Sequence, residues 1–179
     1  TIPIEAAMIA KNIAPGLMRS FTSENWDFID KSHWKAARKE AYSKIDVNCK
    51  PEIYASDIDE KAIQIAKGNA KIAGVDDCIR FEVKPLNKLD IKNIKYGICV
   101  CNPPYAERIG VLEEVEQLYK DMGKIFNSNK TFSTYILTSH EGFEKLYGKK
   151  SDKKRKLFNG NVKVEYYQFF GERPPKTKK

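Results

Sequence analysis

The sequence predicts an α/β protein with an open, mostly parallel sheet that carries an antiparallel element at its end. Short apolar runs typical of strands alternate with segments of helical periodicity through the middle of the chain. The final two strand-like runs follow each other closely, which favours an antiparallel arrangement there. We see no internal repeat and no low-complexity segment.

The elements follow from periodicity and from the residues that start and stop them. Pro15-Gly16 ends the first helical pattern, Asp59 is suited to cap a helix, and Gly74 is suited to end it. The predicted helices are 2–13, 24–43, 59–73, 111–126 and 141–147. The predicted strands are 52–56, 79–83, 96–101, 134–139 and 162–170. We expect Trp26 and Trp34 to be core or domain-packing residues.

Length and charge narrow the class of protein. The 179 residues with 41% hydrophobic content suit one folded domain, here 1–173, with a frayed tail at 174–179. The net charge of +8 favours a polyanionic partner, nucleic acid before a membrane surface. There is no apolar run of spanning length and no visible secretory signal, so we expect a cytoplasmic protein without a membrane partner.

Cysteine and histidine usage argues against a metal site. The four cysteines form no C-x-x-C pair, and there are two histidines in the chain. Cys99 and Cys101 alternate on a predicted strand and are interpreted as small buried residues with reduced thiols.

Asp57 is the first candidate binding residue. It stands at the end of the first predicted strand, and ligands of open α/β sheets bind at the carboxyl ends of strands. A carboxylate there can accept hydrogen bonds from both hydroxyls of a ribose. The alternative is an ordinary turn residue, although Asp59 is the better candidate for the helix cap.

Asn102-Pro103-Pro104-Tyr105, called the tetrad below, is the second candidate and follows the predicted strand at 96–101. Two prolines hold a rigid, extended loop. The Asn102 carbonyl and a proline-loop carbonyl can accept both N–H groups of an exocyclic amine. This frees the nitrogen lone pair to attack a sulfonium methyl, while Tyr105 stacks on the extruded base. The alternative is a structural corner with Asn102 as a turn former.

Four stretches resemble the THUMP-domain-containing bacterial rRNA methyltransferases, which methylate the guanine 2-amino group of 23S rRNA. They are Thr1-Ile2-Pro3-Ile4-Glu5-Ala6-Ala7, Ser56-Asp57-Ile58-Asp59, the tetrad followed by Glu107-Arg108-Ile109-Gly110, and the segment from Gly148 to Gly160. The resemblance spans nearly the whole chain. Older naming places such sequences among adenine-specific DNA methylases.

The resemblance implies a class I fold that uses S-adenosylmethionine (SAM), with S-adenosylhomocysteine (SAH) as product. Asp57 would then bind the SAM ribose, Ile58 would pack on the adenine, and Asn102 would lie between cofactor and base. Glu5 could approach the SAM amino group, or be an ordinary first-turn carboxylate. The family's glycine-rich loop, first strand and THUMP domain are expected before Thr1. Pro85 replaces an adenine-contacting Asp, so a backbone group or Asn87 is expected to take that contact.

A lysine-rich segment between two predicted strands is the expected RNA contact. Its cations are Lys149, Lys150, Lys153, Lys154, Arg155 and Lys156, and Asp152 is its one acid. The alternative is a solvated charge run. Arg108 is expected to bind RNA as well, in a loop over the base pocket.

Three hypotheses for function stay open at this point. The first is an rRNA guanine amino-methyltransferase, and the second is an adenine N6 methyltransferase acting on DNA or RNA. The third is a non-catalytic RNA-binding protein on a methyltransferase fold.

Overall fold

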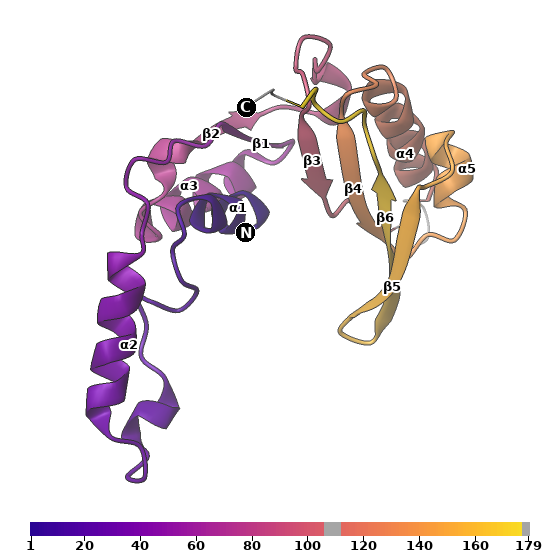
Figure 1. Cartoon of the computed structure of the whole chain (residues 1–179). Helices are drawn as coiled ribbons and strands as arrows, with labels where there is room; N and C mark the ends of the chain where they lie inside the picture. The colour runs from indigo at the N-terminus through magenta and orange to yellow at the C-terminus, as the bar shows by residue number, and fades with distance from the viewer. Residues whose placement is uncertain (106–111, 177–179) are drawn as a thin grey trace. The chain divides into compact units, whose positions relative to one another are not determined.

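A computed structural model describes residues 1–105 and 112–176 of the chain, which divides into two compact units (Figure 1). The first unit comprises Thr1–Val83 and the second begins at Lys84. Each unit combines helices with a sheet of its own, so the predicted α/β class is confirmed and the strands form two sheets.

The first unit is built on two parallel strands, β1 (Ile53–Asp57) and β2 (Ile79–Val83). Helices α1 (Ile2–Ala10) and α3 (Glu60–Ile72) pack on the strands. Because side chains alternate across a strand, the apolar positions of β1 and β2 face the helices together. The buried residues of this core are Ile4, Ala7, Ala70, Val75, Cys78 and Ile79.

Local signals set the helix ends in this unit. Asp59 accepts a hydrogen bond from the Lys61 backbone N–H at 2.8 Å, and Gly74 takes φ +68° after α3. Both confirm the prediction. Helix α1 ends three residues earlier than predicted, because Asn12 adopts a left-handed φ of 54° that an α-helix cannot continue.

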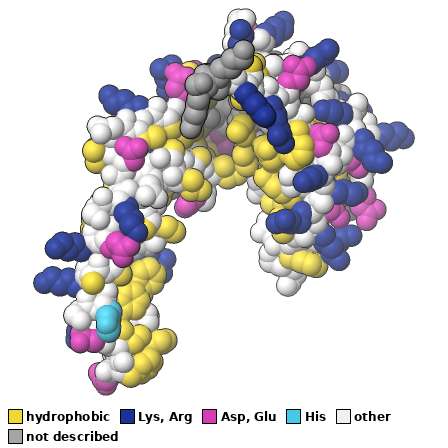
Figure 2. All heavy atoms as spheres, in the orientation of Figure 1, with side chains coloured by type: hydrophobic (Ala, Val, Ile, Leu, Met, Phe, Trp, Pro, Cys, Tyr) yellow, Lys and Arg dark blue, Asp and Glu magenta, His cyan; other side chains and the backbone are white. Residues whose placement is uncertain are grey.

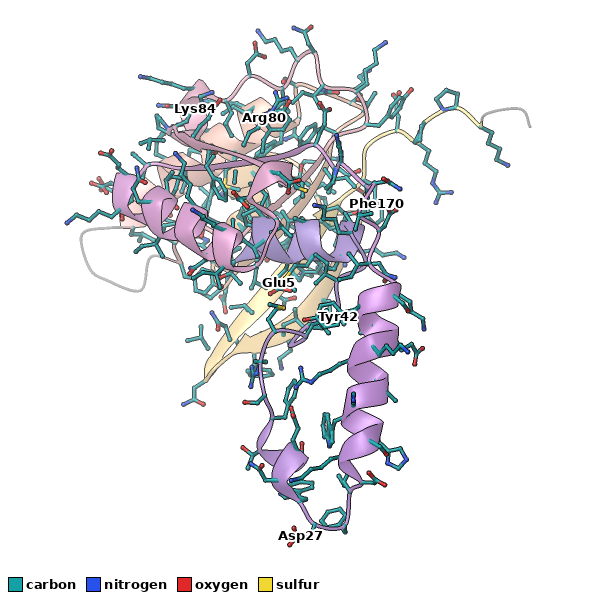
Figure 3. The ribbon with its side chains drawn as sticks, turned by 90° about the vertical axis from the view of Figure 1, so that its left-hand side faces the viewer. Glu5, Asp27, Tyr42, Arg80, Lys84 and Phe170 are labelled. Atoms are coloured by element: carbon teal, nitrogen blue, oxygen red, sulfur yellow. The ribbon has the colours of Figure 1, made fainter. Side chains whose placement is uncertain are left out.

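The segment between α1 and β1 corrects the predicted single helix 24–43. It contains a 3₁₀ turn, η1 (Thr22–Asn25), and a separate helix, α2 (Lys31–Ser43). Trp26 is extended and ends the turn, and Asp30 starts the new helix by accepting from the Ser32 N–H at 2.8 Å. None of the residues of α2 is buried. We call the segment from η1 to the end of α2, residues 22–43, the arm. Figure 3 labels Asp27 at the tip of this arm and Tyr42 towards its base.

The tryptophans of the arm behave differently from each other. The indole of Trp26 is 49% exposed and stacks on Phe28 at 5.4 Å, so the expectation of a core residue is wrong within this unit. Trp34 is half-buried and stacks on Phe21 at 5.9 Å, outside the buried core of the unit. Its expected role in packing against another domain stays a prediction. Hydrophobic atoms accordingly show on the surface of the arm in Figure 2.

The second unit contains a four-stranded sheet in the order β3-β4-β6-β5. Strand β3 (Ile98–Cys101) pairs in parallel with β4 (Ser133–Thr138). Strand β6 (Val162–Phe169) is antiparallel to both β4 and β5 (Lys153–Asn159). The predicted antiparallel last strand is therefore confirmed.

Helices α4 (Leu112–Phe126) and α5 (Phe143–Tyr147) cover one face of this sheet (Figure 1). Cys99 and Cys101 point into the same layer, half-buried against its core, with free thiols. The core is rich in aromatic rings. Its buried residues are Ile91, Val115, Tyr119, Met122, Phe126, Ile136, Phe143, Tyr147, Tyr167 and Phe169.

The lysine-rich segment is a second correction. We predicted a run between two strands, but Lys153–Asn159 is itself a strand, β5, at the edge of the sheet. All of its residues are exposed, so no apolar alternation marks it in the sequence. Lysines on an edge strand also discourage pairing with a second sheet.

The Gly123→Ala substitution should destabilise the second unit. A Cβ at Gly123 in α4 would overlap the backbone carbonyl of Tyr147 at the end of α5. Backbone cannot move aside as a side chain can, so we expect a loss of about 1–3 kcal/mol in the free energy of unfolding. The matched control is Gly68→Ala in α3, where the added methyl meets no atom within 4 Å. The free energy of unfolding of that control should rise by about 1 kcal/mol. Urea denaturation measures both, and equal stability of the two variants would contradict the packing.

Candidate active site

The tetrad lies directly after β3, at the carboxyl end of a parallel strand pair. In the parallel register Cys101 lies opposite Ile136, so the chain leaves β3 beside the last residues of β4. Carboxyl ends of parallel strands are where open α/β sheets bind their ligands. The predicted position of the tetrad at this edge is confirmed.

Within the tetrad, the tyrosine holds the asparagine. The Tyr105 hydroxyl donates to Asn102 Oδ1 at 2.5 Å. An amide oxygen has two lone pairs, so Asn102 Oδ1 can still accept an N–H from an amine beside it. The Asn102 side chain is exposed and Tyr105 is half-buried, which leaves the acceptor open to a ligand.

The loop is also held from the core, through Pro104. The Tyr119 hydroxyl of α4 donates to the Pro104 carbonyl at 2.6 Å and lies 2.8 Å from Thr138 Oγ1, at the end of β4. Tyr119 and Thr138 are both fully buried. Burial raises the pKa of Tyr119, partly offset by the Thr138 hydrogen bond. The phenol therefore stays protonated at neutral pH and remains a donor.

Sequence reasoning missed Tyr119, although a signal for it exists. Tyr119 lies on the buried face of a predicted amphipathic helix, together with Val115 and Met122. A buried tyrosine usually finds a hydrogen-bond partner for its hydroxyl. Because the partner here is a loop carbonyl far from it in sequence, periodicity alone does not reveal which group it bonds.

Three of the predicted cofactor-binding residues, Asp57, Ile58 and Glu5, belong to the first unit. Asp57 is the last residue of β1, and its Oδ1 accepts the Asp59 backbone N–H at 2.9 Å. That bond orients the carboxylate and leaves Oδ2 without a hydrogen-bond partner among the described residues. Ile58 follows with its side chain 74% exposed. An exposed carboxylate oxygen beside an exposed apolar side chain, at the carboxyl end of β1, suits a ribose and a flat base.

Glu5 also lies in the first unit, in the first turn of α1, where its side chain is exposed (Figure 3). Its predicted approach to the cofactor amino group stays a prediction. Pro85 caps a 3₁₀ turn, η3 (Leu86–Lys88), in which Asn87 is exposed. Arg108 lies outside the described residues. The structure thus brings the tetrad residues together in one unit, and Asp57 and Ile58 together in the other.

The predicted RNA-contacting cations lie on and just before β5, and all six are exposed. Some contact aromatic rings: Lys149 lies over Phe169, and Lys156 lies over Phe158 at 5.4 Å. Lys154 is 3.9 Å from the Glu144 carboxylate. Among residues 1–105 and 112–176, no cluster of side chains could hold a metal ion, and no helix could span a bilayer.

The family of the chain is identified by a match over nearly its whole length. Residues 1–168 match the family described as UPF0020, an RMKL-like methyltransferase domain. This chain belongs to that family. The class I methyltransferase fold follows from it and from the structural neighbours below. The suspected kinship is therefore confirmed for the methyltransferase domain.

Relatives of this RMKL-like domain include named RNA methyltransferases. It is 48% identical over 179 residues to the "Putative RNA methyltransferase YpsC" of Bacillus subtilis (strain 168), covering 100% of this chain and 46% of that protein. It is 36% identical over 172 residues to "Ribosomal RNA large subunit methyltransferase K/L" of Legionella pneumophila (strain Corby), covering 93% of this chain and 24% of that protein. The chain thus spans less than half the length of these relatives.

Solved structures resemble the RMKL-like domain closely. A possible methylase from Clostridium difficile 630 has a TM-score of 0.92 at 47% identity, over 98% of this chain and 46% of that one. "SMU.472, a putative methyltransferase complexed with SAH" has a TM-score of 0.91 at 40% identity, over 97% of this chain and 46% of that one. The "predicted N6-adenine-specific DNA methylase" from Listeria monocytogenes str. 4b F2365 has a TM-score of 0.88 at 44% identity, over 96% and 44%.

Proposed function

We propose that this chain is the catalytic domain of a SAM-dependent N-methyltransferase acting on the exocyclic amine of a guanine in large-subunit rRNA. The observation that carries the proposal is the tetrad, held at the carboxyl end of β3 with the Asn102 carbonyl open to a ligand. Kinship with the rRNA large subunit methyltransferase K/L proteins supports the choice of polymer.

Methyl transfer to an amine depends more on the orientation of the amine than on acid or base catalysis. The lone pair of an exocyclic amine is delocalised into the ring, so the amine is a poor nucleophile. Hydrogen bonds from its two N–H groups to Asn102 Oδ1 and a loop carbonyl would direct the lone pair at the methyl donor. Preorganised positioning of this kind can account for several kcal/mol of the barrier. The Tyr105 ring offers a surface for the extruded base.

The first unit fits the cofactor that the family uses. SAM, when bound, supplies an electrophilic methyl on a sulfonium. Asp57 would accept from the ribose hydroxyls through its unbonded oxygen, and Ile58 would lie against the adenine. The same two residues fit SAH, the ligand of the SMU.472 structure.

Replacing the β5 cations Lys153, Lys154, Arg155 and Lys156 with glutamine should weaken RNA binding and its dependence on salt. Every cation that neutralises a phosphate contributes about 0.7 to the slope of log K against log salt on single-stranded RNA, so the slope should become shallower. The matched control replaces Lys61 and Lys71, exposed lysines of α3, with glutamine. Filter binding at several salt concentrations measures the slope. An unchanged slope in the β5 variant would mean that these cations are merely solvated.

One alternative has a specific observation in its favour. The Listeria monocytogenes structure is named as an N6-adenine-specific DNA methylase, and the tetrad discriminates an amine, not the base that bears it. Mass spectrometry of nucleosides from a strain lacking the protein separates the two. Loss of N2-methylguanosine from large-subunit rRNA supports the proposal. Loss of N6-methyladenosine, or of N6-methyladenine in DNA, supports the alternative.

A further inference from the structure

We propose that Tyr119 is a positioning residue for methyl transfer, and that its hydroxyl holds the Pro104 carbonyl so that the tetrad loop presents Asn102 in one orientation. Tyr119 lies outside the tetrad and is not expected to touch substrate or cofactor. The expected effect on methyl transfer rests on the proposed function. Its structural content is independent of which base is methylated.

The donor and acceptor in each hydrogen bond around Tyr119 can be assigned, because the Pro104 carbonyl can only accept and the His140 backbone N–H can only donate. The Pro104 carbonyl can only accept, so the single phenolic proton points to it across 2.6 Å. Thr138 Oγ1, 2.8 Å from the phenol oxygen, must then donate to Tyr119. Thr138 Oγ1 in turn accepts the His140 backbone N–H at 3.1 Å. The three bonds run one way, towards the tetrad, and each polarises the next.

The donor, the Tyr119 hydroxyl, is held by the core, while the acceptor, the Pro104 carbonyl, lies in an exposed loop. The Tyr119 ring is fully buried and meets Phe143 edge-on at 5.0 Å. Thr138 is the last residue of β4. Pro103 and Pro104 have no backbone N–H, so this part of the loop can be tied to the fold only through its carbonyls. The Tyr119 bond therefore decides where the loop sits relative to the sheet edge.

Removal of that bond should lower turnover without lowering cofactor affinity. Asn102 is two residues before Pro104, so a shift of the loop moves the amine acceptor, whereas Asp57 and Ile58 belong to β1 and the residue after it. Displacement of a reacting group by about 1 Å can cost about 100-fold in rate. For Tyr119→Phe, which keeps the ring, we expect kcat to fall at least about tenfold, with KM for SAM unchanged.

The chain offers a matched control in Tyr147. Its ring lies in the same aromatic layer, 2% exposed, and its hydroxyl donates to Thr134 Oγ1 at 3.3 Å, with no bond to the tetrad. Tyr147→Phe in the full-length protein should keep wild-type kcat. Thr138→Ser, which keeps the hydroxyl, should also keep most activity, whereas Thr138→Val, which leaves the Tyr119–Pro104 bond in place, should lose less activity than Tyr119→Phe. Equal losses in Tyr119→Phe and Tyr147→Phe would show a merely structural role and overturn the proposal.

A second readout needs no activity. Pro-Tyr occurs once in this chain, at Pro104-Tyr105. With proline carbonyls labelled with ¹³C and tyrosine amides with ¹⁵N, this chain therefore contributes one HNCO signal, that of the Pro104 carbonyl. Its shift should move in Tyr119→Phe and stay in Tyr147→Phe. If wild-type protein transfers no methyl group, the proposed function fails while this shift still tests the loop anchor. An unmoved shift, or wild-type kcat in Tyr119→Phe, overturns the inference.

Discussion

Asn102→Ala should abolish methyl transfer while leaving SAM binding largely intact. The Asn102 carbonyl is the side-chain acceptor placed to hold the amine, and Tyr105 already orients it across 2.5 Å. Removing one preorganised hydrogen-bonding group from an active site costs about 100- to 1,000-fold in kcat. Asn102 belongs to the second unit, whereas the residues assigned to the ribose and adenine belong to the first. Single-turnover kinetics and calorimetric titration with SAH measure the two quantities separately.

The control for this variant is Asn69→Ala. Asn69 is an exposed residue of α3 whose side chain makes no hydrogen bond within the described residues. It should retain wild-type kcat. Equal loss of SAH affinity and turnover in Asn102→Ala would contradict the assignment, because that outcome means the residue contacts the cofactor as much as the amine.

Asp57→Ala should show the reverse pattern, with weakened cofactor binding as its first effect. A hydrogen bond to a charged group contributes about 1.5–3 kcal/mol, so SAM and SAH should bind about 10- to 100-fold more weakly. The control is Asp27→Ala at the tip of the α2 arm, an exposed acid of the same unit (Figure 3). Saturating SAM should restore most of the turnover of Asp57→Ala. If Asp57→Ala bound SAH as tightly as the wild type, Asp57 would not be a cofactor-binding residue.

The parts of the fold that could be predicted are those with strong local signals. Asp59 and Gly74 bracket α3 because a cap and a left-handed stop are encoded in single residues. The tetrad could be placed at a strand end because two prolines cannot continue either a strand or a helix. Asp57 could be placed at a strand end because it directly follows the strand-like run 52–56.

The parts that sequence reasoning missed depend on contacts distant in sequence or on exposed strands. Strand β5 has no apolar alternation, because its side chains are all exposed, and its register comes from pairing with β6. The break before α2 depends on Asp30 competing as a cap inside a helical pattern. Tyr119 acquires its role from Pro104, which only the folded second unit brings within hydrogen-bonding distance.

We propose that the tetrad presents an exocyclic amine of guanine in RNA to the methyl group of SAM. The most direct test incubates the full-length protein with deuteromethyl-labelled SAM and unmodified large-subunit rRNA, followed by mass spectrometry of the nucleosides. We predict label in N2-methylguanosine with the wild type and labelling at least about 100-fold slower with Asn102→Ala. Label on a carbon or oxygen atom, equal labelling by Asn102→Ala, or no labelling by a wild-type protein that binds SAM would show that the tetrad does not have this role.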